Sequence, residues 1–63
     1  MQDIKQRLEK LRADAEECLL ISQLATNPIK RNAFAQLADE YKNMARDLEA
    51  LIASGNLSGG LGI

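Results

Sequence analysis

The chain has 63 residues, enough for one small domain that buries only about 60% of the surface exposed by its unfolded form. Eight basic and nine acidic residues give a net charge of −1, with no excess in either half, which excludes a basic surface for nucleic acid. One cysteine and no histidine exclude an internal disulfide and a structural zinc site, so association with a partner is the remaining way to stabilise so small a core.

The start of the chain, residues 1–5, carries charged groups and no apolar core, so no secretory signal is expected. The longest apolar run, residues 18–21, is too short to span a membrane. With a single thiol and no signal, we expect a cytoplasmic protein that does not enter a membrane.

Residues 2–25 are predicted to form one helix. Apolar or small residues recur along them in alternating steps of four and three, the spacing that keeps one side of a helix toward a partner helix. Most of the other residues are charged or are glutamine, which suit a helix face in water. The predicted contact row is Ile4, Leu8, Leu11, Ala15, Cys18, Ser22 and Ala25.

A short turn is predicted at residues 26–28. Pro28 lacks an amide hydrogen and disfavours helical geometry at Asn27, so the first helix should end before them. Asn27 is also a good N-cap, and Pro28 is well suited to the first position of a new helix. Two long helices joined this tightly run antiparallel.

Residues 28–54 are predicted to form the second helix, which should end at Gly55 in a left-handed C-cap. Residues 55–63 contain four glycines and no charge, and they are predicted to be a flexible tail. The alternative for the tail is docking onto a groove of a partner. The predicted contact row of the second helix is Phe34, Leu37, Tyr41, Met44, Leu48 and Leu51.

These features predict an all-α fold, an antiparallel two-helix hairpin over residues 1–54 followed by the tail. Folding the chain at Asn27 sets the small Ala15 opposite the large Tyr41, which is the complementarity that close packing requires. The predicted core of the hairpin is Leu8, Leu11, Phe34, Leu37, Tyr41, Met44 and Leu48.

Two helices cannot cover every apolar residue near the turn, and uncovered apolar surface usually marks an interface. Two alanines, Ala38 and Ala45, lie seven residues apart and would let another helix approach closely. A homodimer that packs as a four-helix bundle, with coiled-coil-like contacts, would bury this surface. The alternative is that the leucines are scattered surface residues. The predicted interface is Leu20, Ile21, Leu24, Ala38 and Ala45.

The middle of the chain resembles a group of small bacterial helical-hairpin proteins of unknown function. Their pattern is Ala-x-x-Cys, then Leu-Ala and Ala-Thr-Asp-Pro, a basic residue and Leu-Ala-x-x-Tyr. Here Asn27 replaces the aspartate and Ile21-Ser22 stands where Leu-Ala is usual, and because asparagine caps as well as aspartate, the resemblance still implies a helical hairpin. It implies no activity. The matching residues are Ala15, Cys18, Leu24, Ala25, Thr26, Asn27, Pro28, Arg31, Leu37, Ala38 and Tyr41.

No residue set predicts catalysis, a cofactor or a metal. Cys18 lies in the contact row after two glutamates, so we expect a buried thiol, with a disulfide across a dimer axis as the alternative. The acidic pairs at 16–17 and 39–40 fall off the contact rows and lack histidine, so they are expected to face water. Lys30-Arg31 are expected to pair with acids of a neighbouring helix, with docking to an acidic partner as the alternative.

The sequence therefore predicts a non-enzymatic helical interaction protein that self-associates through its apolar faces. The alternatives are an accessory subunit of a larger complex and a small antitoxin-like regulator. The first would require a protein partner, and the second would require a basic face for which there is no sign. No small-molecule substrate is evident.

Overall fold

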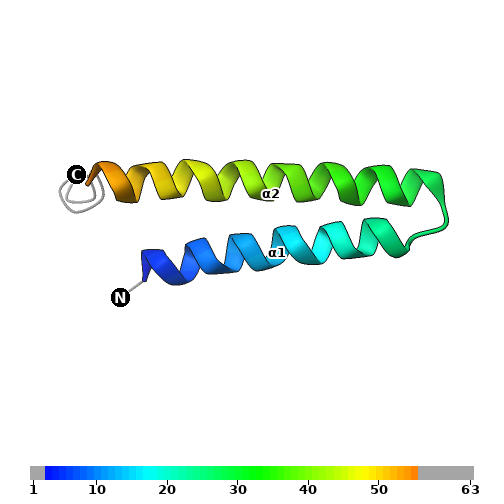
Figure 1. Ribbon diagram of the computed structural model, residues 1–63, viewed down its shortest axis with the longest axis horizontal. Helices are drawn as coiled ribbons and strands as arrows, with labels where there is room; N and C mark the ends of the chain where they lie inside the picture. The colour runs from blue at the N-terminus through cyan, green and yellow to red at the C-terminus, as the bar shows by residue number, and fades with distance from the viewer. Residues whose placement is uncertain (1–2, 56–63) are drawn as a thin grey trace.

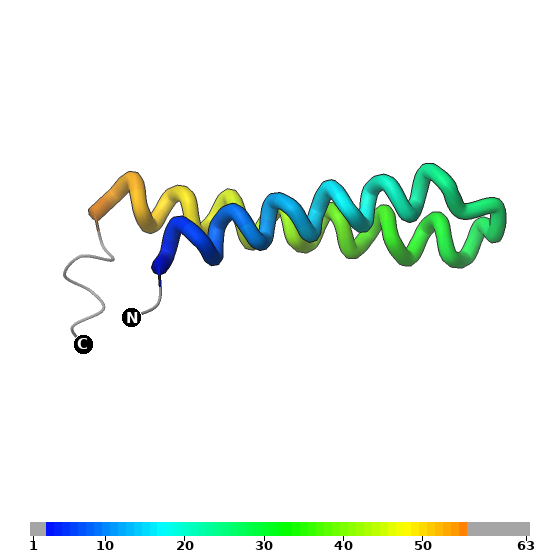
Figure 2. The backbone as a smooth tube through the Cα atoms, turned by 90° about the horizontal axis from the view of Figure 1, so that it is seen from below, coloured from blue at the N-terminus to red at the C-terminus, as the bar shows by residue number. Residues whose placement is uncertain are grey.

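The computed structural model describes residues 3–55, which form two antiparallel helices joined by a short turn (Figure 1). Helix α1 spans Ile4–Leu24 and helix α2 spans Pro28–Ser54. The same two helices lie side by side when the molecule is turned by 90° (Figure 2). The predicted all-α hairpin is confirmed, whereas residues 56–63 of the predicted tail (55–63) lie outside the described residues.

Helix α1 begins two residues later than predicted and ends one residue earlier. Asp3 has extended backbone geometry, and its side chain accepts a hydrogen bond from the Lys5 amide at 3.0 Å, so it acts as the N-cap. At the other end, the Ala25 amide donates to the carbonyls of Ile21 and Ser22 at 3.0 and 3.3 Å. Both helix ends thus satisfy backbone groups that would otherwise lack partners.

The turn forms as the sequence predicts. Asn27 caps α2, and its side-chain oxygen accepts hydrogen bonds from the amides of Ile29 at 2.8 Å and Lys30 at 3.2 Å. Pro28 occupies the first helical position, where a missing amide hydrogen costs nothing. The Ser22 hydroxyl donates to the Arg31 carbonyl at 2.8 Å, which ties the last turn of α1 to the first turns of α2.

Helix α2 ends at the predicted C-cap. Gly55 has φ 77°, a left-handed conformation that glycine adopts without the steric cost of a side chain. Its amide donates to the Ile52 carbonyl at 3.1 Å. The glycine therefore stops the helix after Ser54.

The contact row of α1 is as predicted, whereas on α2 every second position of the predicted row is replaced by the residue that follows it, which corresponds to a small rotation of the helix. Leu8, Ala15, Cys18 and Ser22 are the buried residues of α1, and all four belong to the predicted row. On α2 the buried residues are instead Ala38 and Ala45. Together with four half-buried residues these alanines form one row in steps of four and three. The half-buried residues are Phe34, Tyr41, Leu48 and Ile52.

The physical reason for the rotation is the size of the residues at the contact. Ala15, Ala38 and Ala45 are only 3%, 3% and 6% exposed, so the line of contact runs over small side chains. The distance between packed helices depends on the side chains between them, and alanines permit a close approach. Leu37 and Met44, which were predicted for the core, are pushed to its outer edge.

The resulting core is thin. Within residues 3–55, no large side chain is completely buried. The hairpin is a rod with extents of 46 × 17 × 17 Å, so each helix has a neighbour on one side only. Much of the apolar surface of both helices therefore stays in contact with water.

Candidate helix–helix interaction surface

One side of the hairpin carries a row of large apolar residues on α2. Leu37, Met44 and Leu51 lie seven residues apart, which places them on one side of the helix, and they are 38%, 45% and 41% exposed. They flank the buried alanines on the same edge. The rotation that put alanines into the core is thus what exposes this row.

The opposing edge of α1 is charged along most of its length. Arg7, Lys10, Asp14 and Glu17 follow one another in steps of three and four, and so share one side of the helix. The same spacing leads to the half-buried Ile21 near the turn. The edge is therefore basic near the start of α1, acidic in its middle and apolar close to the turn.

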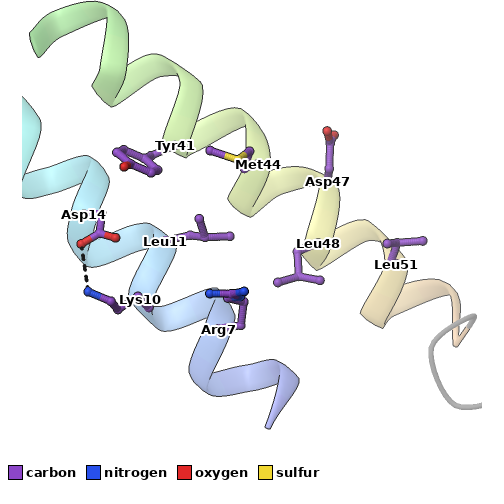
Figure 3. Close-up of a pocket in the computed structure, with 9 residues that line it drawn as sticks. All are labelled: Arg7, Lys10, Leu11, Asp14, Tyr41, Met44, Asp47, Leu48 and Leu51. Atoms are coloured by element: carbon purple, nitrogen blue, oxygen red, sulfur yellow. Dashed lines mark ion pairs between the residues drawn. The ribbon is translucent and has the colours of Figure 1, made fainter. Parts of the chain in front are cut away.

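These two edges enclose an open groove between the helices (Figure 3). In Figure 3, Leu11 and Leu48 point into the space between the helices, and Tyr41, Met44 and Leu51 follow along α2. We call the surface made by both edges the groove face. The groove is lined by Arg7, Lys10, Leu11, Asp14, Tyr41, Met44, Asp47, Leu48 and Leu51.

The charges of the groove are only partly paired. Lys10 Nζ lies 3.5 Å from Asp14 Oδ1, one turn along the same helix (Figure 3). Arg7 and Asp47 line the groove from opposite helices, and within residues 3–55 neither forms an ion pair. A second molecule could therefore supply an acidic partner for Arg7.

The opposite edge of the hairpin is closed by an ion pair. The guanidinium of Arg12 contacts the carboxylate of Glu49, which links α1 to α2 away from the groove. Both side chains are about half exposed, so the pair contributes at most about 1 kcal/mol. The two edges thus differ, since one is bridged by charges and the other is an open apolar groove.

The five predicted interface residues are divided by the structure. Ala38 and Ala45 are buried against α1, so their placement on a partner-facing side is corrected, because their small side chains already serve the helix contact within the hairpin. Leu20 is exposed but lies two residues from both Cys18 and Ser22, on the side of α1 turned away from α2. Ile21 lies in the line of the groove face.

The tip of the hairpin holds the most exposed large apolar side chains. Leu24 is 74% exposed at the end of α1, and Ile29 is 79% exposed at the start of α2. Leu24 continues the spacing of the charged edge by one more turn, at the outer margin of the groove face.

The row of Leu37, Met44 and Leu51 was missed as a surface by sequence reasoning. Two rows with the same seven-residue period run along α2, one of them alanine-centred and one leucine-centred. Leucine and methionine side chains are larger than alanine and bury more apolar surface, so the leucine-centred row was predicted to form the core. The signal that could have decided otherwise is the small set on α1, since Ala15, Cys18 and Ser22 suit a close contact with alanines.

The polar residues singled out from the sequence do not converge. Cys18 is a buried free thiol, and the exposed acids at 16–17 and 39–40 belong to no group of three or more metal-ligating side chains in the described part of the chain. Lys30 and Arg31 are exposed and form no ion pair within residues 3–55, so the expected pairing with acids of the neighbouring helix is absent there.

Neither helix among the described residues has an apolar stretch long enough for a bilayer crossing. Comparison with protein-family models, with curated proteins and with solved structures found no match to this chain. The resemblance to small bacterial helical-hairpin proteins therefore stays a prediction.

Proposed function

We propose that this protein is a non-enzymatic helix–helix interaction module that binds a second copy of itself through the groove face. Two hairpins would then form a four-helix bundle. The observation that carries the proposal is the exposed row of Leu37, Met44 and Leu51, which has the seven-residue period of a coiled coil. Its last two members line the open groove. Exposed apolar surface of this continuity is typical of interaction sites.

The thin core supports the same proposal. A hairpin without a fully buried large side chain gains little from hydrophobic burial, and chains of this size often depend on a partner. Complete burial of a leucine or methionine contributes about 1.5–3 kcal/mol. Because these side chains are already half covered, each would add about 1 kcal/mol on association.

The dimensions of the hairpin suit an interface of ordinary size. A rod 46 Å long and 17 Å wide offers one face that can cover the roughly 800 Å² per partner found in stable complexes. A partner of the same length would use the whole face. A second copy of the chain has this length.

Two side chains with nucleophilic potential, Cys18 and Ser22, support a structural role. Cys18 is buried at the helix contact, and the hydroxyl of Ser22 is occupied by its hydrogen bond to the Arg31 carbonyl. Their roles are packing and fixing the turn. A single buried thiol also suits the reducing cytoplasm, where we place the protein.

The test is sedimentation equilibrium over a wide range of concentrations, with circular dichroism on the same samples. Wild type should be a helical dimer or a dimer of dimers. Met44→Glu places a charge in the row, and the dissociation constant should rise at least about tenfold. The matched control is Ala50→Glu, which adds the same charge to an exposed position on the outer side of α2 and should leave the dissociation constant unchanged.

The contrary results are distinct. Equal dissociation constants for Met44→Glu and Ala50→Glu would show that the groove face is not the interface. A wild-type chain that is monomeric and weakly helical would contradict self-association and favour the accessory-subunit alternative. Salt-sensitive binding to nucleic acid would favour the regulator.

A further inference from the structure

We propose that the two copies pack antiparallel, with α1 on α1, α2 on α2 and the two turns at opposite ends; we call this the head-to-tail arrangement. Its twofold axis crosses the groove beside Leu11 and Met44. This inference rests on the proposed self-association and adds the orientation of the second copy. Two symmetric arrangements can bring the groove faces together. An axis along the rod sets α1 against α2 of the second copy with both turns at one end, whereas an axis across the rod sets like helices together with the turns at opposite ends.

The apolar row of α2 is symmetric about Met44. Leu37 and Leu51 lie seven residues before and after it, so an antiparallel second α2 would bring Leu37 against Leu51 of the second copy. Met44 would then meet its own counterpart at the axis. The whole exposed row would be buried against apolar side chains.

The charged edge of α1 has a matching symmetry of opposite sign. Lys10 and Asp14 are equally far from residue 12, and Arg7 and Glu17 are also equally far from it. In an antiparallel pair of α1 helices, Arg7 therefore comes beside Glu17 of the second copy and Lys10 comes beside its Asp14. Each basic residue gains an acidic neighbour from the other copy, and the twofold axis repeats both pairs.

The two centres of symmetry lie at the same height along the rod. Leu11, next to residue 12, lines the groove from α1, and Met44 lines it from α2 (Figure 3). One axis can therefore satisfy the apolar row and the charged edge together. The coincidence is the reason for choosing this arrangement.

The alternative arrangement mismatches the apolar row, although it would bring Asp47 near Arg7 and Lys10 of the second copy. It would press the row of Leu37, Met44 and Leu51 onto the charged edge of α1, which removes charges from water against apolar side chains. It would also bring Glu17 beside Glu40 of the second copy. The head-to-tail arrangement has a like-charge approach between Glu40 and Asp47 of the second copy, which the twofold axis repeats, and salt screens it at the exposed rim.

A charge swap tests the orientation. Arg7→Glu and Glu17→Arg should each weaken the dimer about tenfold, because two symmetric pairs are lost in each variant. The double variant should bind within about threefold of wild type. These positions are ten residues apart on one helix, too far to interact within a chain, so rescue can only act between copies.

A disulfide provides the second readout. In a Cys18→Ala background, Met44→Cys should form a disulfide-linked dimer under mild oxidation, while Ala50→Cys on the outer side should not. Failure of both the swap and the disulfide, with wild type still dimeric, would overturn the head-to-tail arrangement and leave the proposed self-association intact. A monomeric wild type would overturn both.

Discussion

At the scale of single residues, the contact between the helices is decided by size. Ala15, Ala38 and Ala45 are buried along the line of contact between the helices, and larger residues stand on either side of it. Protein interiors are close-packed, so a residue on this line has no room to grow. The alanines therefore fix both the spacing of the helices and the rotation of α2.

Ala45→Leu should accordingly destabilise the hairpin. The added methylene groups would force the helices apart, at a cost of about 1–3 kcal/mol. Urea unfolding followed by circular dichroism would measure it, at one fixed protein concentration. Ala50→Leu adds the same groups on the exposed side of α2 and should change stability by less than about 0.5 kcal/mol. Equal stability of the two variants would contradict the alanine-centred core.

The residues at the helix contact also show which part of the core can be predicted from the sequence. The contact row of α1 was predictable, because its alternating steps of four and three had no competitor. On α2 the alanine-centred row and the leucine-centred row have the same seven-residue period, so the local pattern does not decide which of them is buried. The choice depends on the size of the α1 residues across the contact. Because the row of Leu37, Met44 and Leu51 was assigned to the core, its exposure was not predicted.

At the scale of the elements, local chemistry sets where each helix begins and ends. Asn27 and Pro28 start α2, and Gly55 stops it, as their backbone preferences predict. The start of α1 was placed two residues early because Asp3 was not recognised as a cap. Helix ends were thus predictable wherever a capping residue was identified.

Removal of the Asn27 cap at the turn should lower the free energy of unfolding, because two hydrogen bonds to backbone amides are lost. Asn27→Ala leaves the amides of Ile29 and Lys30 without their side-chain acceptor, which should cost about 1 kcal/mol. Thermal unfolding at fixed concentration would detect the loss. Asn32→Ala is the control, because Asn32 is exposed within α2 and makes no side-chain hydrogen bond among the described residues. A loss of the same size in both variants would argue against the cap.

At the scale of the whole molecule, folding and association should be one equilibrium. The hairpin core is thin, and the proposed association would bury the groove face and add the apolar burial that the hairpin lacks. Sequence reasoning foresaw that surplus apolar surface from the small size of the chain. It placed that surface near the turn, where Leu20 and Leu24 are exposed, but missed the row along α2, since the side of α2 that stays open depends on how the two helices pack.

The stability of wild type should therefore depend on protein concentration. If two folded chains form one dimer, a tenfold increase in concentration favours the folded state by about 1.4 kcal/mol per dimer, and the melting temperature should rise. Melting curves over a hundredfold range of concentration would measure this shift. Met44→Glu should melt lower and without the shift, whereas Ala50→Glu should behave as wild type, because only the first substitution lies in the groove. A wild-type melting temperature that stays constant over this range would mean that the hairpin is stable without a second copy, and the thin core would then need another source of stability within the chain itself.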